Sequence, residues 1–332
     1  MHHLLINISR TCDVCATILS RPFVTLSIEP HRPYRRRIIM NAHVYRFHVG
    51  TFECAIVNDG TFFYPHPAQV FFDDVPEERV MQALQEHQID PAAWETYPSP
   101  YPSLLVKTGD RIVLVDTGAG GLAPTTGQLL PNLRLIDVAP EEIDTVILTH
   151  GHPDHIGGNL DHTGKPTFPN ARYFMGRTEW DFWATDPDLA SLKIPMFIEI
   201  IRSVARTQLP PLQDRLTLVE DGDEVAPGIA VVAAPGHTPG HIALRITSEG
   251  EQLLWAVDTV LHPIHVEHPD WVSKADYLPH ETVVTRRRLL GQAAVDRALV
   301  HMYHFPFPGL GHVVLHDGGW RWQPLVLPSA NA

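Results

Sequence analysis

The stretch that most constrains this chain runs from Thr149 to Gly158 and reads Thr-His-Gly-His-Pro-Asp-His-Ile-Gly-Gly. It directly follows an apolar run typical of a strand buried on both faces. Neutral imidazole and carboxylate are ligands that zinc and similar borderline ions favour. In an extended segment, side chains two residues apart point the same way, so His150 and His152 can bind one ion. If the chain then turns at the proline into a helix, Asp154 and His155 can point together at a second ion. The pattern indicates a metal site, and a His-rich surface loop is the weaker interpretation.

Composition bounds the class of protein. The chain has 332 residues, 44% of them hydrophobic, which is enough for a sizeable core in one large domain or two ordinary ones. The formal net charge of −13 argues against a general affinity for nucleic acid or anionic membranes. The sequence has no run of about 18 apolar residues, so we expect no transmembrane helix. The remaining expectation is a cytoplasmic protein whose partner is a small molecule.

The N-terminal region differs from the rest of the sequence. Residues 1–39 contain three consecutive arginines and scattered prolines, and they lack the order of a secretory signal. We expect them to be a poorly ordered extension, or Met40 to be the natural start, with residues 40–332 forming a single domain. Cys12 and Cys15 form a lone CxxC, which chance explains best. The low cysteine count fits a reducing compartment.

Periodicity predicts an α/β (α+β) fold. The strands come mostly in hairpins that are interrupted by single helices, with a turn at Asp59-Gly60 and no linker between halves. This arrangement indicates two packed sheets with helices outside. We predict strands at 44–49, 52–57, 103–107, 111–116, 145–149, 172–175, 215–219, 229–233, 242–247, 252–257, 299–303, 312–316 and 320–323. We predict helices at 76–87, 127–136, 178–184, 195–205 and 282–296.

Four further candidate residues stand at or just after the C-terminal ends of predicted strands. They are Asp116, His237, Asp258 and His304. Rigid strands that deliver polar side chains to one edge of a sandwich are a means of building a preorganised site. We therefore expect these residues to lie beside the histidine-rich stretch.

The order Asp116, His-x-His-x-Asp-His at 150–155, His237, Asp258 and His304 resembles the five motifs of the metallo-β-lactamase fold superfamily. The resemblance covers essentially all of residues 41–328, and it implies a four-layer αβ/βα sandwich. It also implies a first metal bound by His150, His152 and His237, a second bound by Asp154, His155 and His304, and Asp258 as the bridge. Asp116 would orient a ligand histidine.

The resemblance further implies a dinuclear metal-dependent hydrolase. In such an enzyme, two divalent ions about 3.5–4 Å apart would hold a bridging water, and the resulting hydroxide would attack an ester, lactone or phosphotriester. We expect zinc, with manganese, iron and cobalt as the other candidates. Asp258 and Asp154 are both candidates for moving the proton to the leaving group, and with Asp116 they make up the candidate catalytic carboxylates.

Residues that differ between branches of the superfamily indicate which branch this chain resembles. Common zinc β-lactamases carry a cysteine where Asp258 stands, and the smaller acyl-homoserine lactonases carry a tyrosine where Leu261 stands. Leu261 and the segment His304-Phe-Pro-Phe-Pro-Gly-Leu-Gly-His312 resemble the methyl parathion hydrolase-like branch. A homodimer is expected from family resemblance alone.

That branch implies an apolar pocket beside the metals. The candidate walls are Trp183, Phe197, Leu261, Phe305 and Phe307, and the candidate lid residues are Phe62, Phe63, Phe71 and Phe72. For Trp183 and Phe197, an ordinary core position is an equal alternative because of their helical spacing. Two other functions stay open: an acyl-homoserine lactonase that acts on quorum-sensing signals, and a non-catalytic metal-dependent binding module.

Overall fold

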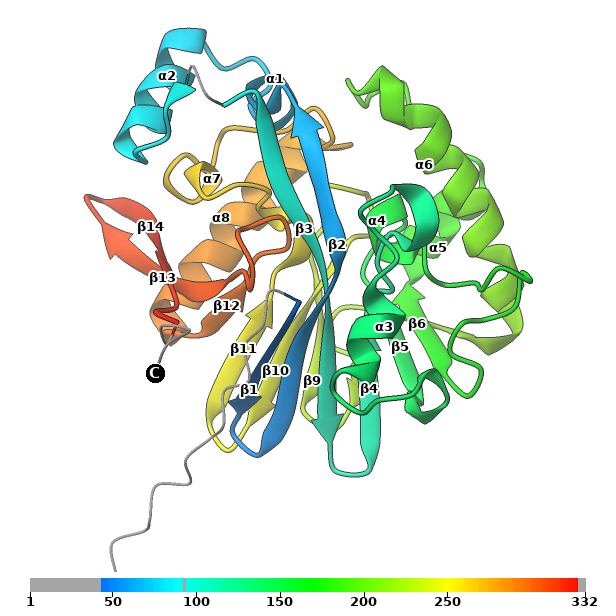
Figure 1. Ribbon diagram of the computed structural model, residues 1–332. Helices are drawn as coiled ribbons and strands as arrows, with labels where there is room; N and C mark the ends of the chain where they lie inside the picture. The colour runs from blue at the N-terminus through cyan, green and yellow to red at the C-terminus, as the bar shows by residue number, and fades with distance from the viewer. Residues whose placement is uncertain (1–42, 92–93, 328–332) are drawn as a thin grey trace, which may run out of the picture. The chain divides into compact units, whose positions relative to one another are not determined.

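Two mixed sheets of seven strands each form the centre of the fold (Figure 1). In spatial order, the first sheet contains β1 (Val44–Val49), β2 (Phe52–Pro65), β3 (Thr96–Thr108), β4 (Arg111–Val115), β5 (Thr145–Leu148), β6 (Arg172–Gly176) and β7 (Leu216–Val219). The second contains β14 (Gly319–Pro324), β13 (Leu310–His316), β12 (Leu299–His301), β11 (Glu251–Trp255), β10 (Ile242–Ser248), β9 (Ile229–Ala233) and β8 (Glu224–Ala226). Strands β4 to β7 run parallel, as do β11 and β12, and the other pairs are antiparallel.

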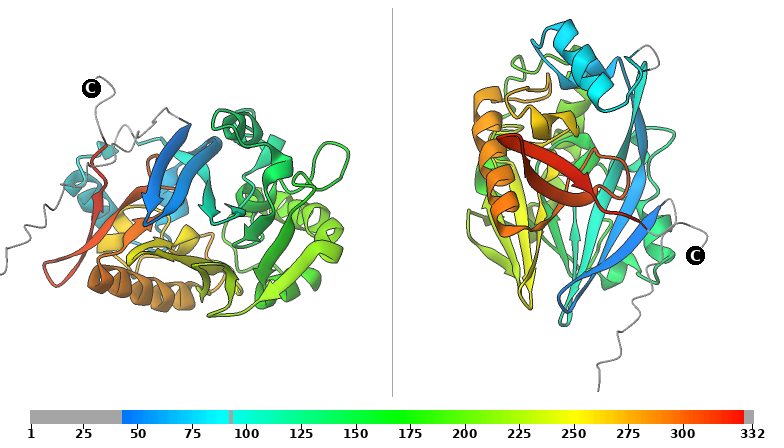
Figure 2. Two further views of the ribbon diagram at one scale, coloured as in Figure 1. Left: turned by 90° about the horizontal axis from the view of Figure 1, so that it is seen from below. Right: turned by 90° about the vertical axis from the view of Figure 1, so that its left-hand side faces the viewer.

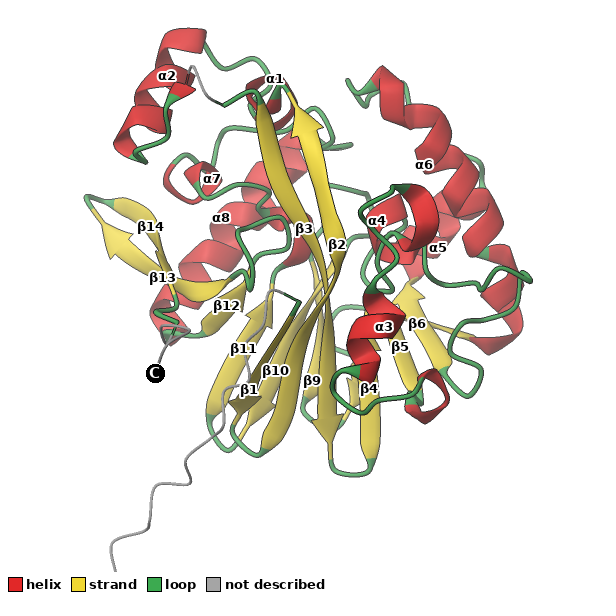
Figure 3. Cartoon of the chain, in the orientation of Figure 1, coloured by secondary structure: helices red, strands yellow, loops and turns green. Residues whose placement is uncertain are grey.

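Helices cover the outer faces of both sheets (Figure 3). On the first sheet lie α3 (Leu129–Arg134), α4 (Pro153–Ile156), α5 (Arg177–Ala184) and α6 (Pro195–Gln208). On the second lies α8 (Pro279–Asp296), which the two further views in Figure 2 show flat against the strands. The helices α1 (Pro67–Phe71), α2 (Glu77–Glu86) and α7 (Ile264–Glu267) gather at one end. The 3-10 turns are Gly120–Leu122, Pro140–Glu142, Pro210–Arg215 and Val257–Thr259.

Alternation along the strands explains the four layers. In β10, Leu244 belongs to the apolar cluster between the sheets, and its neighbour Ala243 belongs to the cluster beneath α8. In β2, Ile56 belongs to the cluster between the sheets and Val57 to the one beneath α3 to α6. Because successive side chains of a strand point to opposite faces, each sheet has two buried faces. The predicted α/β sandwich, with helices outside two packed sheets, is confirmed.

The predicted turn at Asp59-Gly60 is wrong. Strand β2 continues through it to Pro65, with a register shift between Asn58 and Thr61. The Asp59 carboxylate does not cap a turn: it accepts backbone N–H groups from Ala119, Gly127 and Leu129. Long-range hydrogen bonds have therefore replaced the local turn that the residue pair favours.

The structure is a computed structural model that describes residues 43–91 and 94–327. The expectations about residues 1–39 and a start at Met40 lie outside the described residues. All described residues belong to one compact unit. Within them, no helix combines the length and apolar character needed to cross a membrane.

Candidate metal centre

The histidine-rich stretch begins where a buried strand ends. All four residues of β5 are buried, and β5 pairs in parallel with β4 and β6. His152 is still extended, with φ −76° and ψ 153°, and Pro153 then opens the short helix α4. The extended part holds His150 and His152, and the helix holds Asp154 and His155, as the spacing predicted.

The second sheet supplies the other candidates. His237 lies in the loop between β9 and β10, and Asp258 lies in the 3-10 turn Val257–Thr259 that follows β11. His304 comes three residues after β12 ends at His301. The candidate ligands on the two sheets therefore meet at one edge of the sandwich.

One oxygen lies at the centre of this group. Asp258 Oδ2 lies close to the Nε2 atom of four histidines: 3.2 Å from His237, 3.2 Å from His304, 3.4 Å from His155 and 3.6 Å from His150. The Asp258 side chain is 2% exposed. A carboxylate in this position would be able to hold two ions together with these histidines.

Within the part of the chain that the structure describes, two groups of residues have the composition and spacing of a metal site. The first quartet is His150, His152, His237 and Asp258, and the second quartet is Asp154, His155, Asp258 and His304. In each quartet the candidate ligand atoms all lie within 4.8 Å of one another. The two quartets share Asp258.

The buried donor atoms fit metal ions. His150 Nε2, His155 Nε2 and Asp258 Oδ1 are buried and have no hydrogen-bond partner among the described residues. Buried polar atoms in native proteins are nearly always partnered, and a coordinated ion would satisfy these three. His152 Nδ1 also faces His237 Nε2 at 2.9 Å, as two nitrogens aimed at one ion would. Burial, the main cause, holds the pKa of His150 and of His152 well below the usual range, which favours the neutral imidazole that a metal requires.

Asp116 lies behind His155. Its Oδ2 is 2.9 Å from His155 Nδ1, and it also accepts the backbone N–H and the hydroxyl of Thr149 at 2.8 Å each. Asp116 has a φ of 59°, a left-handed conformation that aspartate tolerates better than most residues. With Nδ1–H bound to Asp116, the lone pair on Nε2 of His155 is directed into the site.

Other supporting contacts come from residues that the sequence did not single out. Ser99 Oγ lies 2.7 Å from His304 Nδ1, and Asp276 Oδ1 lies 3.1 Å from His237 Nδ1. Burial opposes the charge on His237, but Asp258 and Asp276 outweigh it and raise the pKa of His237 to about 9. Ser99 and Asp276 are far in sequence from the histidines that they contact, so no local pattern indicated them.

Glu179 on α5 links two loops of the site. Its fully buried carboxylate accepts hydrogen bonds from Gly151 N at 2.8 Å and Trp183 Nε1 at 2.7 Å through Oε1. Through Oε2 it accepts Thr238 Oγ1 at 2.6 Å and Gly240 N at 3.0 Å. One sequence signal could have found it: Glu179 is a charged residue four positions before Trp183, on the apolar side of a predicted helix.

Four other histidines of the described residues have structural surroundings. His241 Nε2 accepts the backbone N–H of Asp258 at 3.3 Å. His262 and His265 are buried beside the rings of Phe71 and Phe72. His268 stacks on Trp271.

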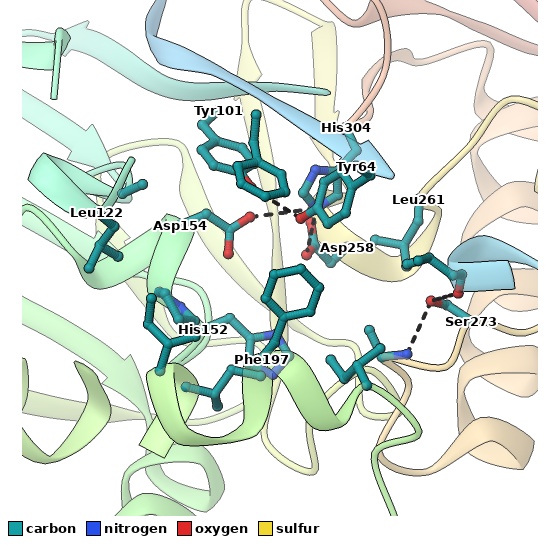
Figure 4. A pocket seen from close by; sticks show the side chains of 18 of the residues that line it. Tyr64, Tyr101, Leu122, His152, Asp154, Phe197, Asp258, Leu261, Ser273 and His304 are labelled. Carbon is teal, nitrogen blue, oxygen red and sulfur yellow. Dashed lines mark hydrogen bonds and ion pairs between the residues drawn. The ribbon is translucent and has the colours of Figure 1, made fainter. Parts of the chain in front are cut away.

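An apolar cavity opens beside the two quartets. Figure 4 shows Asp154, Asp258 and His304 on one side of it and Phe197 of α6 opposite. Phe197 and Leu261, two of the candidate walls, line the cavity, and so do Phe62 and Phe71 from the expected lid. Tyr64 and Tyr101, which no sequence pattern indicated, contribute a hydroxyl pair 3.1 Å apart.

Five of the aromatic residues predicted for the pocket lie elsewhere. The ring of Trp183 packs in the core beneath α5, and its N–H is bound by Glu179. Phe305 packs against Trp322 in the cluster under α8, and Phe307 packs against the cluster between the sheets. Phe72 is buried in the cluster around α1 and α7, and Phe63 is 52% exposed. Alternation on β2 explains the last case, because Phe62 and Phe63 point to opposite faces.

Comparison with known proteins agrees with this geometry. The Metallo-beta-lactamase superfamily profile matches residues 96–323, so the chain belongs to that superfamily. It is a metal-dependent hydrolase of this class, as the sequence predicted.

The N-acyl homoserine lactonase AiiA of Bacillus thuringiensis subsp. kurstaki is 26% identical over 221 residues, which cover 60% of this chain and 79% of that protein. The Drosophila melanogaster beta-lactamase-like protein 2 homolog is 32% identical over 162 residues, covering 47% of this chain and 46% of that protein.

Two solved structures match nearly the whole described fold. AidC, a dizinc quorum-quenching lactonase in complex with its product N-hexanoyl-L-homoserine, has a TM-score of 0.77 and 28% identity, over 86% of this chain and 99% of that chain. The hydrolase AbOPH of the beta lactamase superfamily has a TM-score of 0.78 and 28% identity, over 88% of this chain and 100% of that chain.

Proposed function

We propose that this protein hydrolyses lactones and esters that carry an apolar group, using two divalent ions held by the two quartets. The observation that carries the proposal is the position of Asp258: one buried oxygen is shared by both quartets at the wall of an apolar cavity. The likeness to a dizinc lactonase supports lactones as the first substrate class to test. Zinc is the metal we propose, since the ligands are imidazoles and carboxylates.

The cavity explains what the chain contributes to substrate binding. Phe62, Phe71, Phe197, Ile200 and Leu261 offer apolar contacts. An acyl chain or aromatic ring is therefore the part of a substrate that the cavity selects. The reacting carbonyl would point toward Asp154 and Asp258, the acidic end of the cavity.

The ions, when bound, would lower the pKa of a water molecule and polarise the carbonyl or phosphoryl oxygen of the substrate. Asp258 and the ligand imidazoles would hold the two ions in place, and Asp116 keeps His155 in the ligating tautomer. Asp154 is the more accessible carboxylate, with a side chain 13% exposed against 2% for Asp258. We therefore assign proton delivery to the leaving group to Asp154, because a proton must pass between the carboxylate and the substrate.

A second candidate is a phosphotriester hydrolase. We propose that the chain lies in the methyl parathion hydrolase-like branch, supported by Leu261 and the segment 304–312. Leu261 lines the cavity, so it offers an apolar wall where a tyrosine would offer a hydroxyl. The predicted cytoplasmic location and homodimer stay predictions.

A substrate panel on metal-reconstituted protein tests the proposal. Metal content is measured first, and about two equivalents per chain are expected. The panel contains N-butyryl, N-hexanoyl and N-decanoyl homoserine lactones, an aryl butyrate ester and paraoxon. Faster turnover of lactones supports the first candidate, and faster turnover of paraoxon supports the second. A His152→Ala variant is the matched control, because it removes one ligand of the first quartet alone.

Protein with well under one metal equivalent that turns over a substrate would refute the dinuclear site. Bound metal without turnover of any panel member, in both the wild type and His152→Ala, would favour the non-catalytic binding module.

A further inference from the structure

A buried arginine contacts the chain beside the candidate metal centre. Arg286 lies on α8 and is fully buried. Its Nε donates to the carbonyl of Thr259 at 2.8 Å, and its Nη1 donates to the carbonyls of Pro269 and Trp271. Burial lowers the pKa of Arg286 to about 10, so the guanidinium keeps its charge at neutral pH. A buried charge is costly unless it has polar partners, and these three carbonyls supply part of that compensation.

The charged partner of Arg286 is Asp276. Arg286 Nη2 lies 3.9 Å from Asp276 Oδ2 and makes no hydrogen bond within residues 43–91 and 94–327. Both side chains of this pair are 0% exposed. Asp276 Oδ2 accepts the backbone N–H of Ser273 at 2.8 Å, while its other oxygen faces His237 Nδ1 at 3.1 Å. A chain of contacts thus runs from Arg286 through Asp276 to a member of the first quartet.

We propose that Arg286 and Asp276 are positioning residues that set the affinity of the first quartet for its metal ion. The inference rests on the proposed dinuclear site and adds the part of the chain that tunes one half of it. Arg286 acts through Asp276 on His237, which belongs to the first quartet alone. In the second quartet, His155 and His304 instead contact Asp116 and Ser99.

The chemical reason lies in the two nitrogens of His237. Its Nε2 lies 2.9 Å from His152 Nδ1 and 3.2 Å from Asp258 Oδ2, so Nε2 is the atom that faces the ion. A neutral imidazole ligates through Nε2 only if the proton stays on Nδ1. A carboxylate accepts hydrogen bonds and does not donate them, so Asp276 fixes the proton on Nδ1. The guanidinium of Arg286 balances the negative charge of that buried carboxylate.

Replacing Asp276 by asparagine tests whether Asp276 holds the proton on His237 Nδ1. The backbone N–H of Ser273 needs an acceptor, so the amide oxygen of asparagine turns toward it and the NH2 group faces His237 Nδ1. An NH2 donor favours an unprotonated Nδ1, which moves the ring proton to Nε2, where it blocks ligation. The substitution keeps the size and shape of the side chain. It therefore changes the hydrogen-bond direction with little effect on packing.

The experiment is a competition titration of zinc between the apoprotein and a chromophoric chelator, resolved into two binding steps. We expect Asp276→Asn to weaken one step by about 10- to 100-fold, the usual size of such an effect, and to leave the other within about threefold. Arg286→Lys, which keeps the charge, should weaken the same step by less. The matched control is Arg287→Met on the same helix, since Arg287 is 47% exposed and paired with Asp270. It should leave both steps unchanged.

Two results would overturn the inference: both steps unchanged in Asp276→Asn, or both weakened equally. Long-range proton–nitrogen NMR of zinc-loaded wild type gives an answer that needs no variant. We expect His237 to carry its proton on Nδ1, and ligation through Nδ1 would overturn the inference even if the variants failed to fold. Wild type that binds no zinc would instead refute the proposed function.

Discussion

Replacing Glu179 by glutamine tests how much the link between the two ligand loops contributes to stability. The carboxylate accepts Gly151 N and Trp183 Nε1 through one oxygen, and Thr238 Oγ1 and Gly240 N through the other. Gly151 stands between His150 and His152 in the sequence, and Thr238 follows His237. Both loops of the first quartet therefore depend on this one side chain.

The magnitude follows from the four donors. Glutamine replaces one oxygen by an NH2 group, and the hydroxyl of Thr238 is the only one of the four donors that can reverse and accept from it. The least costly arrangement turns the NH2 toward Thr238 and leaves Gly240 N without an acceptor, at about 1–3 kcal/mol. The other hydrogen bonds also lose their charge assistance. Burial, which raises the pKa of Glu179, works the other way, because a neutral amide is easier to bury. We expect a net loss of about 2 kcal/mol in the free energy of unfolding.

The assay is urea unfolding of metal-free protein, followed by far-UV circular dichroism and analysed by linear extrapolation. Metal-free protein separates the loop contacts from metal binding. The control is Glu199→Gln on α6, a residue with an 83% exposed side chain paired to Arg202, and it should change stability by less than about 0.5 kcal/mol. Equal unfolding midpoints for Glu179→Gln and Glu199→Gln would refute this reasoning.

Three further predictions concern the site and the core. Asp258→Asn should weaken both zinc-binding steps in the chelator titration and lower kcat/KM by at least about 1000-fold, because Asp258 belongs to both quartets. Weakening of one step alone would contradict the shared site. Phe197→Ala should raise KM for N-decanoyl homoserine lactone by about 10-fold and change KM for the N-butyryl substrate less, because part of an apolar contact is lost; equal changes would exclude Phe197 as a chain-binding wall. Burial raises the pKa of Cys54 to about 12, well above the usual thiol value, so the thiolate is scarce at neutral pH and forms only as pH rises toward 12. A Cys12→Ser/Cys15→Ser variant should therefore show no thiol reacting with a disulfide reagent at about pH 8 until denaturant is added, and rapid native labelling would contradict the burial of Cys54.

The candidate ligands could be predicted because their signals are local. The stretch from 149 to 158 combines ligand residues with a preceding buried strand, and His304 and Asp258 each follow a short apolar strand. Parallel strands carry such residues to one edge, so strand prediction already placed them together. The turn at Asp59 was wrong because its partners lie about 60 to 70 positions further along the chain.

The supporting residues Asp276 and Ser99 could not be predicted, since their partners depend on tertiary packing. Asp276 and Ser99 contact histidines that lie 39 and 205 positions away. Trp183 and Phe197 both lie on apolar helix faces, and periodicity cannot tell a face over the core from a face over a cavity. The first packs in the core and the second lines the cavity.

Each quartet draws two members from the first half of the chain and two from the second: His150 and His152 join His237 and Asp258, and Asp154 and His155 join Asp258 and His304. Neither half alone holds either complete set. If the chain were divided between β7 and β8, we would expect each fragment to bind zinc weakly and the reassembled pair to bind it tightly. Metal uptake would then report the docking of the two sheets. The ions would act as cross-links between the two halves of the chain, which folding has to bring together.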